Sequence, residues 1–265
     1  MSDIRPVGIF DSGIGGLTVL REIHRQWPAE ECLYLADALE APYGNKEPDF
    51  IRARCARLVD FLCEKNAKAV VVACNTASVV ALAQLRERFP VPFVGIVPAV
   101  KPAAEISQTR KIGVLATPAT ARSRSLADLI QQYTLGAVVI TEPCDGLAEI
   151  IESGTLDGPQ IERLLLRCLR RMLDAGVDVI ALGCTHYPLA REAIQRACGP
   201  EITLVDPAAA VARQLGRVLV ERDLANAPNR EGATTFYTTG DASRLEEMVG
   251  RLGAPRGATY VHVDL

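Results

Sequence analysis

Two stretches of the chain read almost as copies of each other. They are VVVACNTAS, which contains Cys74, and VIALGCTHYPL, which contains Cys184. In each, an apolar run ends in a cysteine that small polar groups follow at once. Such a run is typical of a buried strand, and α/β proteins place ligands at the carboxyl ends of parallel strands. The pair therefore predicts that each half of the chain delivers one thiol to a ligand site.

The rest of the chain alternates between apolar runs and helical patterns. Because the runs are rich in Val, Ile and Leu without polar alternation, they favour parallel sheets with helices on both faces, an α/β fold. Strands are predicted near 5–10, 32–36, 69–73, 92–96, 111–115, 136–140, 177–182, 202–205, 234–238 and 258–263. Helices are predicted near 16–26, 48–66, 76–88, 120–132, 157–175, 188–197, 208–222 and 242–251.

The two cysteine strands belong to a larger internal repeat. VGIFDSG at 7–13 resembles IGVLATP at 112–118, and VGIVPAV at 94–100 resembles TLVDPAA at 203–209. All pairs are separated by nearly the same number of residues. We therefore expect two similar α/β domains related by pseudo-symmetry, with the ligand cleft between them. The predicted domains are 1–98 plus 208–265, and 99–207, with the segment after 208 packing back on the first.

Composition narrows the class of protein. The chain has 265 residues, 49% hydrophobic and 23% charged, with a net charge of −3. No basic block suggests contact with nucleic acid. The apolar runs are far shorter than the roughly 18 residues of a membrane span, and no signal region precedes VGIFDSG, so we expect a cytoplasmic protein.

The cysteines do not form a recognisable staple or metal pattern. There are eight, but no CxxC, and only three histidines accompany them, so no zinc site is expected. A chain of this size has core enough to fold without disulfides. Cys55, Cys63 and Cys168 lie on predicted helices, where they are interpreted as small buried apolar groups.

Two loops of the first half have both a structural and a functional interpretation. DSGIGG at 11–16 follows a strand and opens a helix, so it is either a structural turn or an anion cradle. Asp11 in it either caps the helix or works in the cleft. Asp37 nearly supplies the acid of a dinucleotide site, but the glycine spacing is not GxGxxG. APYGNK at 41–46 is either a surface turn or a loop whose Tyr43 and Gly44 amides contact a carboxylate.

The CNT and CTH turns carry the strongest signal. A single buried cysteine is usually core filler, but two in matching positions of a repeat favour function. Forming a thiolate at pH 7 costs about 2 kcal/mol from a reference pKa of about 8.5, which a helix N-terminus or a cation can offset. His186 is either that neighbour of Cys184 or a structural histidine. Thr117 and Thr120 either cap the next helix or bind a carboxylate.

These motifs together resemble a known family. FDSGIGGLTVLREI, PYGNK, ACNTAS, GVLATPAT and GCTHYPL, in this order, are similar to the glutamate racemases of the cofactor-independent aspartate/glutamate racemase superfamily, from about residue 7 to 210. The resemblance implies interconversion of L- and D-glutamate, a small-molecule substrate, for peptidoglycan biosynthesis. It implies no cofactor and allows a homodimer, while charge and hydropathy already argue against nucleic-acid and membrane contact and the cysteine pattern against a metal.

The resemblance also assigns residues. Cys74 would act on the D-enantiomer and Cys184 on the L-enantiomer, with Asp11 and His186 assisting. The implied substrate-binding residues are Asp11, Ser12, Tyr43, Gly44, Asn75, Thr76, Thr117, Thr120, Glu152, Thr185 and His186. Taken alone, Glu152 reads as a solvated helix-end acid. The chain departs from the family pattern at Leu39 and Glu40, which would alter the cleft rim, and at Asp145, which makes the alignment of Glu152 less secure.

Three other functions are compatible with parts of this sequence pattern. Another racemase substrate, such as aspartate or a hydantoin, fits the same thiols, although PYG and THYPL favour glutamate. A two-lobed amino-acid-binding protein has no need of two matched cysteines. A thiol redox protein is disfavoured by the missing CxxC.

Overall fold

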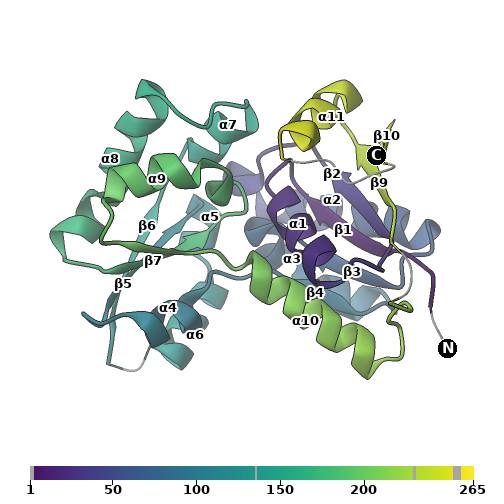
Figure 1. Ribbon diagram of the computed structural model, residues 1–265, viewed down its shortest axis with the longest axis horizontal. Coiled ribbons are helices and arrows are strands. Elements are labelled where there is room, and N and C mark those ends of the chain that lie inside the picture. Colours follow the sequence, from purple (N-terminus) through teal and green to yellow (C-terminus); the bar gives the residue numbers. More distant parts are fainter. Residues whose placement is uncertain (1–2, 135, 229–230, 253–257) are drawn as a thin grey trace. The chain divides into compact units, whose positions relative to one another are not determined.

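The computed structural model describes residues 3–134, 136–228, 231–252 and 258–265. Its chain divides into two compact units (Figure 1). Unit 1 comprises residues 1–96 and 208–265, and unit 2 comprises residues 97–207. Residues 1–2, 135, 229–230 and 253–257, which fall inside the predicted domains, lie outside the described residues. Among the described residues, no helix has the length and apolar character needed to cross a membrane.

Unit 1 contains a six-stranded parallel sheet in the order β10-β9-β2-β1-β3-β4. The strands are β1 (Val7–Asp11), β2 (Cys32–Ala36), β3 (Ala69–Val72), β4 (Phe93–Gly95), β9 (Thr234–Thr238) and β10 (Thr259–His262). The helices are α1 (Leu17–Gln26), η1 (Tyr43–Asn45, a 3-10 turn), α2 (Pro48–Glu64), α3 (Asn75–Arg88), α10 (Ala208–Glu221) and α11 (Ala242–Arg251).

The helices of unit 1 cover both faces of this sheet. The chain passes from β1 to β2 on one side and then returns past β1 to β3, and right-handed crossovers put the two connecting helices on opposite faces. Accordingly, α1 packs against α10, and α2 packs against α3 (Figure 1). Because both faces are covered, all strand residues from β1 to β3 are buried, which explains their unalternated apolar runs.

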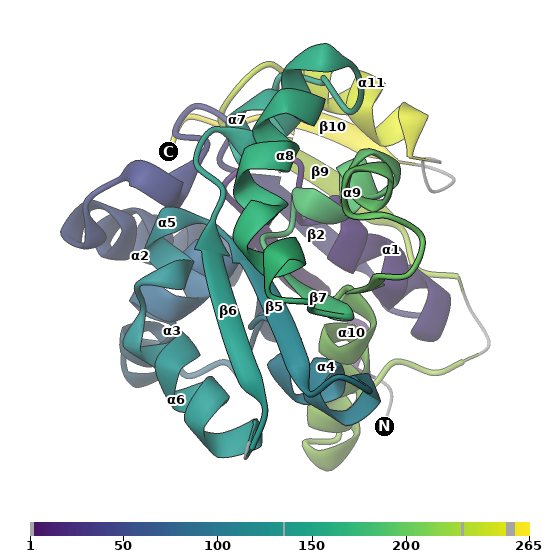
Figure 2. The same ribbon diagram turned by 90° about the vertical axis from the view of Figure 1, so that its left-hand side faces the viewer.

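Unit 2 repeats this pattern with four parallel strands in the order β6-β5-β7-β8. The strands are β5 (Lys111–Ala116), β6 (Val138–Pro143), β7 (Val179–Gly183) and β8 (Thr203–Val205). The helices are α4 (Val100–Ile106), α5 (Pro118–Ala121), α6 (Arg124–Tyr133), α7 (Leu147–Glu152), α8 (Pro159–Asp174), η2 (Tyr187–Ala190, a 3-10 turn) and α9 (Arg191–Cys198). Figure 2 shows β6 and β5 side by side, and α8 packs on this pair. The predicted α/β class with parallel sheets is confirmed.

Strand order fixes where each sheet opens to a ligand. From β1 the chain moves to one neighbour, and from β3 it moves the opposite way, so a crevice is expected between the carboxyl ends of these two strands. The same reversal separates β5 from β7 in unit 2. The residues that directly follow these four strands are therefore the best placed to meet a small molecule.

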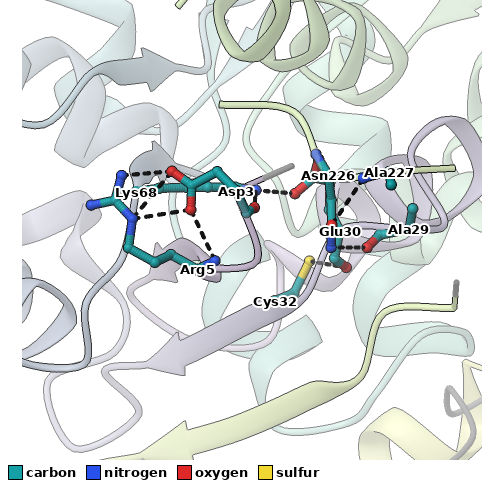
Figure 3. A network of polar contacts seen from close by, with 8 residues as sticks. All are labelled: Asp3, Arg5, Ala29, Glu30, Cys32, Lys68, Asn226 and Ala227. Atoms are coloured by element: carbon teal, nitrogen blue, oxygen red, sulfur yellow. Dashed lines mark hydrogen bonds and ion pairs between the residues drawn. The ribbon is translucent and has the colours of Figure 1, made fainter. Parts of the chain in front are cut away.

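The opposite end of the unit 1 sheet is closed by a buried ion pair. The Lys68 side chain is fully buried just before β3, and its Nζ lies 2.6 Å from Glu30 Oε2 (Figure 3). Lys68 also donates to the Asp3 carbonyl, and the main-chain N–H of Asn226 donates to Glu30 Oε1 at 2.7 Å. This cluster joins four segments that are distant in the sequence, at the end of the sheet opposite the ligand end.

The structure corrects the interpretation of one cysteine. Cys168, expected to be simple core filler on its helix, is joined to Cys144 by a disulfide. The bond connects α8 to the turn between β6 and α7. Unit 2 therefore contains a disulfide, although a chain of this length was expected to fold without one. The other six cysteines are free thiols.

Candidate functional site

In unit 1, three site residues meet where β1 and β3 end. Asp11 is the last residue of β1, and Cys74 follows β3 by two positions. Ser12 lies between them, because its hydroxyl donates to Asp11 Oδ1 at 3.1 Å and lies 3.6 Å from Cys74 Sγ. All three side chains are at most 5% exposed. A hydroxyl therefore links the carboxylate to the thiol, a contact that the sequence did not indicate.

The loop around Asp11 requires a glycine at position 16. A Cβ there would lie 2.8 Å from Asp11 Cβ and 2.9 Å from the Tyr34 hydroxyl, closer than real side chains approach. Tyr34 donates that hydroxyl to the Gly13 carbonyl at 2.8 Å. The DSGIGG loop is thus folded tightly over Asp11 and fixed from β2.

The Cys74 sulfur also caps the following helix. Cys74 is the residue before α3, and its Sγ accepts from the main-chain N–H of Ala77 at 3.5 Å. An amide donor and the positive end of a helix dipole both favour negative charge at this point. The position of Cys74 therefore suits a group that alternates between thiol and thiolate.

Asn75 presents an incomplete set of hydrogen bonds. Its side chain is 1% exposed, yet neither Oδ1 nor Nδ2 has a hydrogen-bond partner among the described residues. Burying an amide without a partner costs roughly 1–3 kcal/mol. Such a group beside Cys74 is therefore suited to binding a polar ligand, which would restore the missing bonds. Thr76, next in the chain, is buried as well.

The PYG loop is buried, not a surface turn. Tyr43 and Gly44 open the short η1 turn, which packs against α3. Glu40, at the position that departs from the family pattern, forms an ion pair of 2.5 Å with Lys46 across this loop. Leu39 beside it is 68% exposed.

In unit 2, a second thiol has a histidine partner. Cys184 follows β7 directly, and its Sγ lies 3.8 Å from His186 Nδ1. Glu152, at the end of α7, places its Oε2 2.5 Å from the other ring nitrogen, Nε2. Glu152 is thus not the solvated acid that its sequence context suggested. The three form a continuous line from carboxylate to imidazole to sulfur.

This arrangement controls the charge of His186. Burial lowers the pKa of the imidazole, but hydrogen bonds to Cys184 and Glu152 and the charge of Glu152 raise it, and together they hold the pKa well above its usual value. The protonated ring can therefore persist near neutral pH and give a proton toward Cys184.

Hydroxyl groups surround the same strand ends. Thr117 follows β5, where its Oγ1 accepts from the Thr120 main-chain N–H at 3.2 Å and donates to Thr120 Oγ1 at 3.0 Å. The capping role is thus present, and both threonines and Thr185 are buried. Tyr187, which the sequence did not single out, reaches back with its hydroxyl to the carbonyls of Ala116 and Cys144 at 3.1 and 3.2 Å.

Close packing of β7 against β5 brings these loops together. A Cβ at Gly183 would lie 2.9 Å from Ala116 Cβ, so only glycine fits directly before Cys184.

Within the described residues, His, Cys, Asp and Glu side chains do not gather into a group of three or more that could hold a metal ion.

Comparison with known proteins identifies the family. Residues 7–215 match the profile of the Asp/Glu/Hydantoin racemase family. The chain belongs to this family. It is 49% identical to a glutamate racemase of Roseiflexus sp. (strain RS-1) over 259 residues, which cover 96% of this chain and 95% of that one.

Solved structures of the racemase family agree in fold. A glutamate racemase from Bacillus anthracis superposes with a TM-score of 0.87 at 32% identity, covering 98% of this chain and 97% of that one. The Escherichia coli glutamate racemase, solved with L-glutamate and the activator UDP-MurNAc-ala, gives a TM-score of 0.85 at 32% identity and covers 98% of each chain. The two thiols of the present chain thus lie in a racemase fold.

Proposed function

We propose that this protein is a glutamate racemase that interconverts L- and D-glutamate by proton transfer between Cys74, Cys184 and the substrate Cα. The observation that carries the proposal is the equivalence of the two thiols. Each follows a strand next to the point where the strand order of its sheet changes direction. Cys74 is linked through the Ser12 hydroxyl to Asp11, and Cys184 lies beside His186. The similar glutamate racemases support the choice of substrate.

The residue types fit the chemistry of racemisation. In one direction a thiolate removes the Cα proton, and the thiol on the opposite face of the carbon returns a proton. The thiolate has then become a thiol and the thiol a thiolate, so the protein is ready for the reverse reaction. Two like groups therefore suit a reversible process, and each placed acid or base contributes roughly 10²–10⁴-fold to the rate.

We assign assisting roles to the neighbours of each thiol. Asp11, through Ser12, would exchange a proton with Cys74, which would act on the D-enantiomer. His186, whose protonated form Glu152 stabilises, would exchange a proton with Cys184, which would act on the L-enantiomer. Charge that develops on the substrate carboxylate during deprotonation would be stabilised by hydrogen-bond donors, for which we propose the polar groups of Tyr43, Gly44, Asn75, Thr76, Thr117, Thr120 and Thr185.

The deciding experiment is incubation with L-glutamate in D₂O without added cofactor. We expect deuterium at Cα and growing D-glutamate. Cys74→Ser and Cys184→Ser should each nearly abolish the reaction, whereas Cys63→Ser, a change of a free thiol on α2, should leave it unchanged. Full activity in either site variant would refute the two-thiol mechanism. Activity on aspartate but not glutamate would refute the substrate.

Location and assembly complete the proposal. We place the protein in the cytoplasm, where it would supply D-glutamate for peptidoglycan, and propose a homodimer of the 28.6 kDa chain. Cell fractionation tests the first statement. Light scattering of the purified protein, which distinguishes one chain from two, tests the second.

A further inference from the structure

A second buried carboxylate lies beside Asp11 and has no part in the chemistry described so far. Asp37 directly follows β2, and its main-chain N–H donates to the Asp11 carbonyl at 2.9 Å. Its side chain is fully buried. A carboxylate at this edge of the sheet is either a further acid or base, or a residue that holds others in place.

The hydrogen bonds of Asp37 decide between these roles. Oδ1 accepts from Arg54 Nη2 at 2.5 Å and from Thr239 Oγ1 at 2.9 Å. Oδ2 accepts from Arg54 Nε at 2.7 Å and from the Tyr43 hydroxyl at 2.5 Å. Each oxygen thus has two donors, and the guanidinium balances its charge. A carboxylate so occupied is poorly placed to receive a proton from a substrate.

Two of the donors come from outside the PYG loop, one from α2 and one from the segment after β9. Arg54 lies on α2, where it is 7% exposed although its neighbours on the helix face are apolar. Thr239 follows β9, in the segment after residue 208 that has no counterpart in the repeat. Its Oγ1 also accepts from the Leu39 main-chain N–H at 3.1 Å, so it fixes the turn that leads into the loop.

Tyr43 connects the hydrogen bonds of Asp37 to the surroundings of the Cys74 thiol. Its ring lies in the same buried apolar cluster as Cys74 and Cys55. Burial raises the pKa of Tyr43 well above its usual value, and the negative charge of Asp37 adds to this effect, so the hydroxyl stays protonated and keeps donating. The loop that begins at Tyr43 is therefore anchored at its first side chain.

We propose that Asp37 is a positioning residue that, with Arg54 as its countercharge, holds the Tyr43 hydroxyl and so preorganises the Tyr43–Gly44 amides for a substrate carboxylate. This inference rests on the proposed function for its substrate. Without the hydrogen bond from Tyr43 to Asp37, the loop would become ordered only when the substrate binds. The entropy lost in ordering the loop would then lower the affinity for the substrate. Asp37 takes no part in proton transfer.

The test separates binding from chemistry. Tyr43→Phe removes only the hydroxyl, and we expect KM to rise by about 10-fold for both enantiomers, the loss typical of a hydrogen bond to a charged group. We expect kcat to stay within about 3-fold, the signature of lost uniform binding. Asp37→Asn should act in the same direction. The pH profile of kcat should keep its shape in both, and Tyr237→Phe, outside the network, should leave KM unchanged.

A second measurement needs no activity. The Lys46 main-chain N–H donates to the Tyr43 carbonyl at 3.1 Å, so its hydrogen exchange reports the order of the loop. We expect faster exchange in Tyr43→Phe than in the wild type or Tyr237→Phe. Unchanged KM and unchanged exchange would overturn the inference, as would an Asp37→Asn variant with wild-type KM and a shifted pH limb. If the wild type does not act on glutamate, the proposed function fails, and the exchange experiment still decides whether Asp37 orders the loop.

Discussion

The two thiols occupy equivalent places but have different neighbours. Cys74 lies against a hydroxyl and a helix N-terminus, while Cys184 lies against an imidazole. The Ser12 hydroxyl stays neutral, whereas the His186 ring can carry a positive charge. We therefore expect the two halves of the reaction to respond differently to pH and to mutation of their helpers.

The Glu152–His186 contact leads to a direct prediction. Because hydrogen bonding to Glu152 raises the pKa of His186, Glu152→Gln should lower that pKa toward the ordinary value of 6.5. An NMR titration of the His186 Cε1 proton, assigned with His186→Asn, measures it. Glu149→Gln, on the same helix, controls for the loss of one negative charge. An unchanged titration midpoint in Glu152→Gln would contradict the prediction.

The same pKa shift has a consequence for stability. A histidine whose pKa is raised on folding stabilises the folded chain fully below its unfolded pKa, and that stabilisation disappears as pH rises through the folded pKa. The relevant window therefore begins at the ordinary value of 6.5 and extends upward to the folded value. Thermal unfolding of the wild type and Glu152→Gln should differ at neutral pH and converge above that window.

Some of these residues were visible in the sequence and others were not. Cys74 and Cys184 could be predicted because each ends a continuous apolar run, which marks a buried strand, and because the two runs occupy matching positions of the repeat. The contacts of Ser12 and Glu152 depend on rotamers and on where α7 ends, which no local pattern carries. Arg54 left a faint signal, because it interrupts the apolar face of a predicted helix, and a buried arginine requires an anion such as Asp37.

At the scale of elements, the strands were predictable and two helices were not. β1 to β10 appear where apolar runs predict them. Burial on both faces demands such runs in β1, β2, β3 and β7, which are buried along their whole length. α4 is absent from the predicted helices. It contains Pro102, but proline is tolerated in a first helical turn, where its missing N–H has no partner to lose. α7 is only one and a half turns long and follows Gly146 with a φ of 83°, so it had too little periodicity to be recognised.

The buried ion pair at the amino end of β3 gives a test of what holds unit 1 together. Lys68→Met leaves Glu30 charged, buried and without its countercharge, which costs about 3–5 kcal/mol. Lys68→Met combined with Glu30→Met removes both charges and should be much less destabilising than the single change. Urea unfolding measures both, with the exposed Lys65→Met as control. A loss below about 1 kcal/mol in the single variant would mean that the pair contributes little.

At the scale of the whole molecule, the repeat seen in the sequence corresponds to a shared topology. The order β2-β1-β3-β4 in unit 1 is the order β6-β5-β7-β8 in unit 2, and the cysteines follow the corresponding strands β3 and β7. The enantiomers of glutamate have equal free energies in water, so a racemase has equivalent work to do in both directions. A duplicated unit with one thiol in each copy suits that requirement. The two copies are not identical, because the additional strands β9 and β10, and Thr239 after β9, occur only in unit 1.

Unit 2 is one continuous stretch of chain with its own sheet, two buried apolar clusters and a disulfide. We therefore expect a fragment of residues 97–207 to fold by itself and to unfold in one cooperative urea transition, followed by circular dichroism. Because it contains Cys184 but not Cys74, it should release no D-glutamate from L-glutamate and place no deuterium at Cα in D₂O. The full-length chain under the same conditions is the control. A non-cooperative transition would show that the unit depends on the rest of the chain for its core, and racemisation by the fragment would show that one thiol suffices.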